Sequence, residues 1–139
     1  MSRKQLLLLP AAALACGLLG WTLRGAADAH RVYELRTYTT LEGKLPDLQA
    51  RFRNHTTKLF EKHGIANIGY WVPSDDPMKS NTLIYIVAHK SRDAAKKSWD
   101  AFRADPEWIR VRDTSEAKGK IVEKVVSVYM DPTDFSALK

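Results

Sequence analysis

The sequence predicts one α+β domain in which four antiparallel strands carry helices on one face. Three observations predict this fold: short runs alternate from residue to residue, apolar residues recur at helical spacing between those runs, and the elements come in the order strand, helix, strand, strand, helix pair, strand. The chain has 139 residues, of which 45% are hydrophobic, and this length and composition suit one domain with one core.

The first half of the predicted domain is a strand, a helix and a second strand. Residues 31–39 alternate with the period of two that is typical of a strand. Residues 42–63 change to helical spacing, with Pro46 in the first turn, where its missing N–H is harmless, and with Gly64 as the expected C-terminal cap. The expected buried stripe of this helix is Leu45, Leu48, Phe52, Thr56, Leu59 and His63. Residues 65–73 predict the second strand.

The second half is a strand, two capped helices and a last strand. The third strand covers residues 81–89 and comes after a polar loop that contains a proline. Ser91 is the expected N-cap of the next helix, and Asp105 that of a further helix that ends at Gly119. Residues 120–130 form a valine-rich last strand. This βαββαβ order is ferredoxin-like and places the first strand at the centre of a four-stranded antiparallel sheet.

The N-terminal segment, residues 1–29, differs from the domain at 30–139. Two basic residues precede an apolar stretch, 6–23, that carries no charge, which is the layout of an export signal. Three interpretations stay open: cleavage after Ala29, an uncleaved membrane anchor, or lipidation at Cys16. We therefore expect a periplasmic or extracellular protein, or one anchored in the membrane through residues 6–23.

Composition excludes several classes of function for the domain. Cys16 is the single cysteine, so without residues 1–29 no disulfide, thiolate nucleophile or cysteine metal ligand remains. Three of the 22 basic and one of the 16 acidic residues lie in that segment, which leaves 19 against 15 and a net charge of +4. The basic residues are interspersed with acids, and residues 81–90 lack the aromatic basic motif of RNA-recognition sheets, so we expect no nucleic-acid partner.

Both faces of the predicted sheet are apolar. In the third strand Leu83, Tyr85 and Val87 oppose Ile84, Ile86 and Ala88, and in the last strand Val122, Val126, Val128 and Met130 oppose Ile121, Val125 and Tyr129. The helices can cover only one face, and an exposed apolar patch of that size is unusual on a monomer. We therefore expect a homodimer that buries about 800 Å² per partner.

Two stretches resemble the NIPSNAP family: VYELRTYT at 32–39, and residues 83–119, which include DPEWIRVRDTSEAKG at 105–119. The resemblance extends from residue 31 to about residue 137. It implies a dimeric α+β barrel, in which two ferredoxin-like sheets pair face to face. It implies no catalytic residue.

The candidate ligand-binding residues are Glu34, Arg36, Tyr38, Trp71, Tyr85 and His89. Glu34, Arg36 and Tyr38 share one face of the first strand. If Tyr33 and Leu35 face the helices, this charged pair faces the space between the two sheets, where a charge must be paired or must meet a ligand. Neutralisation of the pair and anion binding both remain open.

The aromatic candidates and the histidines add weaker signals. Tyr38, Trp71 and Tyr85 either line one cavity or fill the core. His89 ends the third strand, as a base at the mouth of the cavity or as a solvated strand end. Two helix histidines eight residues apart are separated by roughly 12 Å of helical rise, which is too far for one metal ion. We expect no metal site and no cofactor.

Three functions are compatible with these residues. The first is an exported small-molecule-binding or interaction module. The second is an enzyme of the cofactor-free monooxygenase or haem-degrading type that uses the intersheet cavity. The third is a dimeric scaffold that residues 6–23 tether to a membrane. No catalytic residue is assigned, so whether the protein is an enzyme stays open.

Overall fold

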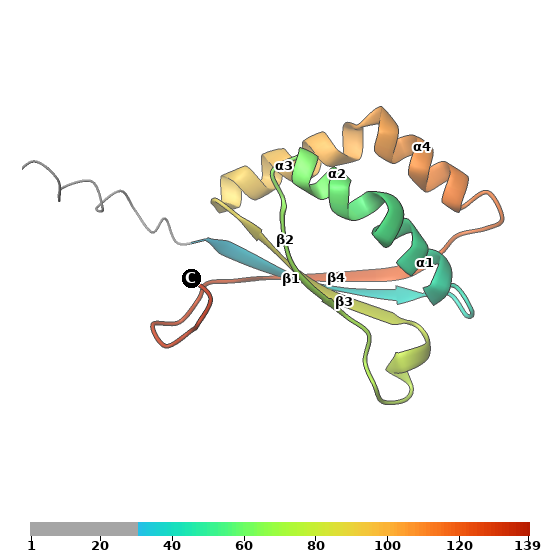
Figure 1. The fold of residues 1–139 in the computed structure, drawn as a ribbon, viewed down its shortest axis with the longest axis horizontal. Coiled ribbons are helices and arrows are strands. Elements are labelled where there is room, and N and C mark those ends of the chain that lie inside the picture. Colours follow the sequence, from blue (N-terminus) through green and yellow to red (C-terminus); the bar gives the residue numbers. More distant parts are fainter. Residues whose placement is uncertain (1–30) are drawn as a thin grey trace, which may run out of the picture.

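The computed structural model describes residues 31–139 as a sheet covered by helices on one face (Figure 1). The elements are β1 (Val32–Thr40), α1 (Leu45–Arg51), η1 (Phe52–Thr56), α2 (Thr57–Lys62), β2 (Ala66–Trp71), η2 (Met78–Ser80), β3 (Thr82–His89), α3 (Arg92–Ala104), α4 (Pro106–Ser115) and β4 (Val122–Met130). The predicted order of elements is confirmed. The expectations for residues 1–29, including lipidation at Cys16, lie outside the described residues. Within residues 31–139, no helix has the length and apolar character needed to cross a membrane.

The sheet has the order β2-β3-β1-β4, and each neighbouring pair is antiparallel. The predicted central position of β1 is confirmed. In the register, Arg36 lies opposite Tyr85 on β3 and Ser127 on β4, while Glu34 lies opposite Val87 and Tyr129. Because opposed residues share a sheet face, β1, β3 and β4 all contribute to one polar cluster on the helix side.

The helix predicted for residues 42–63 is observed as α1, the π-helical turn η1 and α2, which follow one another without a gap. The side chains of Thr56 and Thr57 donate hydrogen bonds of 3.2 and 3.3 Å to the carbonyl oxygens of Arg51 and Phe52, five residues earlier. A π turn adds a residue to the helix and rotates the helical turns after it. Five of the six residues of the expected stripe are buried, His63 is half-buried, and Phe60, which was not part of the expected stripe, is buried as well.

The two later helices begin at the predicted caps. Ser91 Oγ accepts a 3.0 Å hydrogen bond from the N–H of Ala94, and Asp105 Oδ1 accepts one of 2.8 Å from the N–H of Glu107. Both bonds satisfy backbone donors that the first turn of a helix leaves free. Asp105 both ends α3 and starts α4, so the chain changes direction between them (Figure 1).

The core lies between the helices and the sheet and is rich in aromatic rings. Tyr85, at the centre, is fully buried, stacks on Tyr70 with 5.2 Å between ring centroids and contacts Phe52 and Phe60. Burial raises the pKa of the Tyr85 hydroxyl well above its ordinary value, so this side chain is a neutral core residue.

The opposite sheet face is apolar and largely open, as predicted. Trp71, Val126 and Val128 on this face are 52%, 43% and 49% exposed. The C-terminal tail passes over one end of the face, where the Tyr33 hydroxyl donates a 2.8 Å hydrogen bond to the carbonyl oxygen of Lys139 (Figure 1). Most of the face lacks a cover within the described chain, and the homodimer stays a prediction.

Candidate functional site

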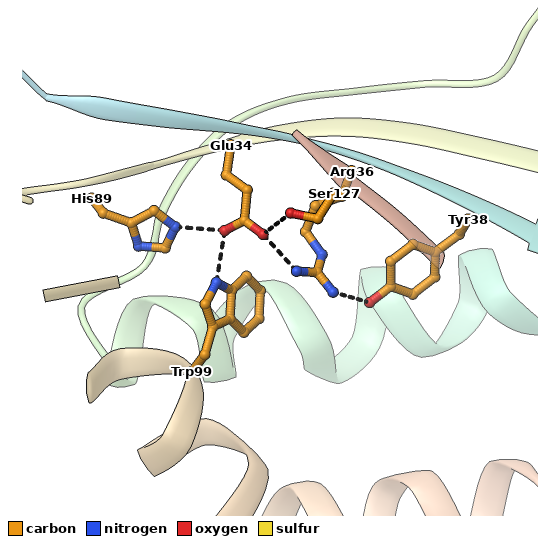
Figure 2. A network of polar contacts seen from close by, with 6 residues as sticks. All are labelled: Glu34, Arg36, Tyr38, His89, Trp99 and Ser127. Atoms are coloured by element: carbon orange, nitrogen blue, oxygen red, sulfur yellow. Dashed lines mark hydrogen bonds and ion pairs between the residues drawn. The ribbon is translucent and has the colours of Figure 1, made fainter. Parts of the chain in front are cut away.

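A buried carboxylate, Glu34, is the centre of the polar cluster (Figure 2). Its Oε1 accepts hydrogen bonds of 2.6 Å from Arg36 Nη1 and 2.6 Å from Ser127 Oγ. Its Oε2 accepts bonds of 2.7 Å from Trp99 Nε1 and 2.9 Å from His89 Nε2. The four donors come from β1, β4, α3 and β3. Because a carboxylate offers about four acceptor positions, Glu34 is saturated by this cluster.

The surroundings of Glu34 keep it ionised. Burial alone would raise its pKa, but hydrogen bonds from His89, Ser127 and Trp99, together with the charge of Arg36, lower the pKa from 4.5 to about 2. An ionised and saturated carboxylate is a weak proton acceptor at neutral pH. Glu34 therefore orients its four donors and balances charge, and it is poorly suited to act as a general base.

Arg36 is the cation that this cluster positions. Its Nη2 lies 3.5 Å from the Tyr38 hydroxyl, and its guanidinium carbon lies 4.4 Å from the centre of the Trp99 ring, close enough for a cation–π contact. Burial would lower the pKa of Arg36, but Tyr38, Tyr85 and Glu34 together raise it above its ordinary value. Its Nε is buried and has no hydrogen-bond partner within residues 31–139.

Arg36 and Glu34 form the floor of a cleft of about 500 Å³ between α3 and the β1–β4 side of the sheet. The cleft is lined by the cations Arg36, Arg92, Lys96 and Arg103, the acids Glu34 and Asp93, and the side chains of Trp99, Ser127 and Tyr129. Lys96 and Arg103 are both paired with Asp100, at 2.8 and 2.6 Å. The guanidinium of Arg92 lies 3.4 Å from the centre of the Tyr129 ring, and the described chain supplies no acidic partner for it.

His89 is neither at a cavity mouth nor solvated. It is 2% exposed, lies beside the rings of Trp99 and Tyr129, and does not line the cleft. Because Glu34 is ionised, the hydrogen of the His89–Glu34 bond belongs to Nε2. The other ring nitrogen, Nδ1, is buried without a hydrogen-bond partner in the described part of the chain.

The expected orientation of the charged pair is wrong. Glu34, Arg36 and Tyr38 face the helices, while Tyr33 and Leu35 lie on the open face. The physical reason is that the helix side supplies the indole N–H of Trp99, whereas the open face of the sheet is apolar. The pairing of Glu34 with Arg36 is observed within one chain, at 2.6 Å.

The expected aromatic pocket also divides between the two faces. Tyr38 and Tyr85 are neighbours on the helix side, with 5.4 Å between ring centroids. Trp71 pairs with Ile84 on the opposite face, so it cannot line the same cavity. Five of the six candidate residues are therefore brought to the helix side, and whether they bind a ligand stays a prediction.

Sequence reasoning missed Trp99, Ser127, Arg92 and Tyr129. Trp99 falls within the helix predicted after Ser91, where an aromatic residue suits the core as well as a polar site. A usable signal for Ser127 existed, because it is the single serine in a valine-rich strand. No comparable signal existed for Arg92, which is one of several basic residues near the start of α3.

Known structures share this fold. A NIPSNAP family protein of unknown function from Agrobacterium tumefaciens is 24% identical, with a TM-score of 0.69 over 81% of this chain and 97% of that one. A NIPSNAP-like domain protein from Burkholderia xenovorans is 16% identical, with a TM-score of 0.67 over 78% and 90% of the two chains. A Streptomyces coelicolor monooxygenase, from the gene ActVA-Orf6 and in complex with nanaomycin D, is 12% identical, with a TM-score of 0.56 over 80% and 95%.

The predicted fold class is confirmed by these neighbours, which have α+β barrel folds. A search of curated proteins finds no match. The family model named NIPSNAP matches residues 33–137, which is nearly all of the described chain; it covers the stretch at 83–119 and all but the first residue of the stretch at 32–39. The chain therefore belongs to the NIPSNAP family.

Proposed function

We propose that this protein is a homodimeric binding module whose cleft beside α3 holds a small organic anion. The observation that carries the proposal is the placement of Arg36, a cation held rigidly at the floor of an open cleft by a carboxylate that three other donors share. A guanidinium binds a carboxylate through two parallel hydrogen bonds when its donors are free and its position is fixed.

The charge of the cleft supports an anion over a neutral ligand. Four cations and two acids line it, and Asp100, which pairs with Lys96 and Arg103, brings the formal charge of the whole group to +1. Glu34 already accepts four hydrogen bonds, so it has no free acceptor position for a ligand. Arg92 has no acidic partner among the described residues. The volume of about 500 Å³ is within the range of small-molecule sites. Trp99 and Tyr129 add apolar contact area, which favours a ligand that carries a flat ring.

A matched pair of probes tests the charge requirement. The carboxylate 2-naphthoate should bind in isothermal titration calorimetry, while its neutral analogue 2-naphthamide should bind much more weakly. Arg92→Gln should weaken binding of the carboxylate roughly fivefold, which is what the loss of one partly exposed charge contact allows. Lys97→Gln is the control, because Lys97 is exposed on the same helix and does not line the cleft. Equal binding of the two probes would contradict the proposal.

The second candidate is an enzyme of the cofactor-free monooxygenase or haem-degrading type. Two observations favour it: a shared fold with a monooxygenase, and the buried His89 ring with its unpartnered Nδ1 in the described chain. Glu34 argues against an enzyme, because its lowered pKa and its four hydrogen bonds make this carboxylate a poor general base. If the protein is a binding module, purified protein mixed with quinols or with haem should show no change in absorbance. Turnover that is abolished by Arg36→Ala would favour the enzyme.

The homodimer is the proposed cover of the open sheet face. Apolar side chains from all four strands meet there, and a second copy offers a matching apolar surface. Val128→Glu should convert the dimer to a monomer in light scattering. Val125→Glu is the matched control, since Val125 is similarly exposed on the same strand but points to the helix side. A wild-type protein that is monomeric at micromolar concentration would remove this part of the proposal.

Export is the proposed route for this module, supported by the pattern of charge and hydropathy in residues 1–29. Intact mass of protein recovered from an exporting host is the test. A mass that lacks residues 1–29 is expected for the periplasmic or extracellular protein, while a retained segment would indicate an anchored one.

A further inference from the structure

A second groove, of about 400 Å³, lies between α1 with its π turn and α4. It shares no lining residue with the cleft beside α3. Its walls carry the cations Lys44, Arg51, Arg110 and Lys118, and Asp47 is the one acid among its lining residues. With His55 neutral, the lining has a formal charge of +3. This is a larger excess of positive charge than the cleft beside α3 carries.

Arg51 is the buried cation of this groove. It is 6% exposed, and its Nη1 donates to Ser115 Oγ at 3.2 Å and to Glu116 Oε1 at 3.1 Å. Its guanidinium carbon lies 5.4 Å from the centre of the Trp108 ring. Its Nε is buried and has no hydrogen-bond partner in residues 31–139. Burial of a donor without an acceptor costs free energy, so packing and the pair with Glu116 do not by themselves account for this arrangement.

Few acids neutralise the other cations of the groove. Lys44 is paired with Asp47 at 3.2 Å, but Arg110 and Lys118 make no ion pair within the described chain. Like charges that line one concave surface raise the local concentration of anions. The groove is therefore lined by the buried Arg51 and by two cations, Arg110 and Lys118, that no acid among the described residues neutralises.

The π turn η1 also contributes residues to this groove. Its residues Asn54 and His55 line the groove, opposite the hydroxyls of Thr114 and Ser115 on α4. π turns occur often at functional sites, because the added residue redirects side chains from the regular helical positions. The groove thus combines guanidinium, amine and amide donors with the hydroxyl of Thr114, while the hydroxyl of Ser115 donates to the carbonyl oxygen of Arg112 at 2.8 Å.

We propose that the groove between α1 and α4 binds the phosphoryl group of a small molecule, with Arg51 as its buried anchor. A phosphoryl group carries up to two charges and three acceptor oxygens, so it can meet several donors that approach from different sides. A single carboxylate would leave more of these cations without a partner. The proposal is independent of the ligand in the cleft beside α3, since the two sites use different residues.

Inorganic pyrophosphate is the probe, titrated into the full-length protein at low ionic strength and followed by calorimetry. Pyrophosphate should bind, and the double variant Arg110→Gln, Lys118→Gln should weaken binding about fivefold or more, from the loss of two exposed charges. Arg112→Gln is the matched control, because Arg112 is on the same helix, is paired with Asp113 and does not line the groove. Its effect should stay within about twofold.

Arg51→Lys tests the anchor, since it keeps the charge beside Glu116 but removes Nε. Pyrophosphate binding should weaken, while an unchanged far-UV circular dichroism spectrum shows that the variant is folded. Absence of pyrophosphate binding by the wild-type protein would overturn the proposal. The single variant Arg110→Gln matches Arg112→Gln in the charge that is removed. Equal weakening by these two single variants would also overturn the proposal, because the effect would then depend on net charge and not on the groove.

Discussion

Glu34→Gln removes one charge from the buried cluster and changes its shape very little. The wild-type carboxylate accepts four hydrogen bonds, whereas the amide of glutamine presents two N–H donors to groups that are themselves donors. The variant also leaves Arg36 without its buried partner. We expect a large loss of stability at neutral pH, because the breaking of a buried pair is strongly destabilising.

The magnitude comes from the pKa of Glu34, which is lowered from 4.5 to about 2. At 1.36 kcal/mol per pH unit, this difference corresponds to about 3 kcal/mol of folding stability at pH 7. The folded-state pKa is the lower one, so the stabilisation is complete above about pH 5.5 and is lost as the pH falls through 4.5 toward 2. At pH 3 about 1 kcal/mol remains, so the stability advantage of wild type over the variant should shrink by about 2 kcal/mol between pH 7 and pH 3.

Urea unfolding at pH 7 and pH 3, followed by tryptophan fluorescence at one protein concentration, measures this difference. Trp99, whose indole N–H donates to Glu34, is one of the four tryptophans that contribute to this signal. Glu123→Gln is the control, because Glu123 is exposed on β4, and it should stay within about 0.5 kcal/mol of wild type at both pH values. A Glu34→Gln protein within about 1 kcal/mol of wild type at pH 7, or with an unchanged deficit at pH 3, would refute the electrostatic account of the cluster.

Three further substitutions test single contacts by urea unfolding. Trp99→Phe keeps an aromatic ring but removes one donor to Glu34, and it should cost about 1–3 kcal/mol; no change would mean that this hydrogen bond contributes little. Ser91→Ala removes the acceptor for the first turn of α3 and should cost about 1 kcal/mol, while Ser91→Asp should keep most of the stability. Gly64→Ala should cost about 1 kcal/mol because the glycine has φ +73°, although an added Cβ meets no close contact; an unchanged stability would contradict the backbone argument.

The order of strands and helices could be predicted because it depends on neighbours in the sequence. Ser91 and Asp105 cap their helices where the sequence placed them, and Gly64 has the positive φ expected of a helix C-cap. These contacts reach two or three residues along the chain, so their signals survive in the sequence alone. The π turn at residues 52–56 was not predicted, because the apolar spacing around it is compatible with a continuous α-helix.

The candidate site was recovered in part. The polar pair Glu34 and Arg36 was identified, and its pairing within the chain is observed. Its direction was assigned to the wrong side, because alternation along β1 separates two faces but does not say which of them the helices cover. Because β3 and β4 carry apolar side chains on both faces, hydrophobicity does not show which face the helices cover.

By itself, the sequence determined which segments form strands and helices, the division of each strand into two faces, and the lack of a cysteine in the domain. Only the tertiary structure decided which face holds the charges. Trp99 lies 65 residues and Ser127 lies 93 residues after Glu34, and these donors reach the carboxylate only when α3 and β4 are packed against β1. A buried charge is stable only beside its hydrogen-bond partners, and the sequence does not show which residues from distant segments come together.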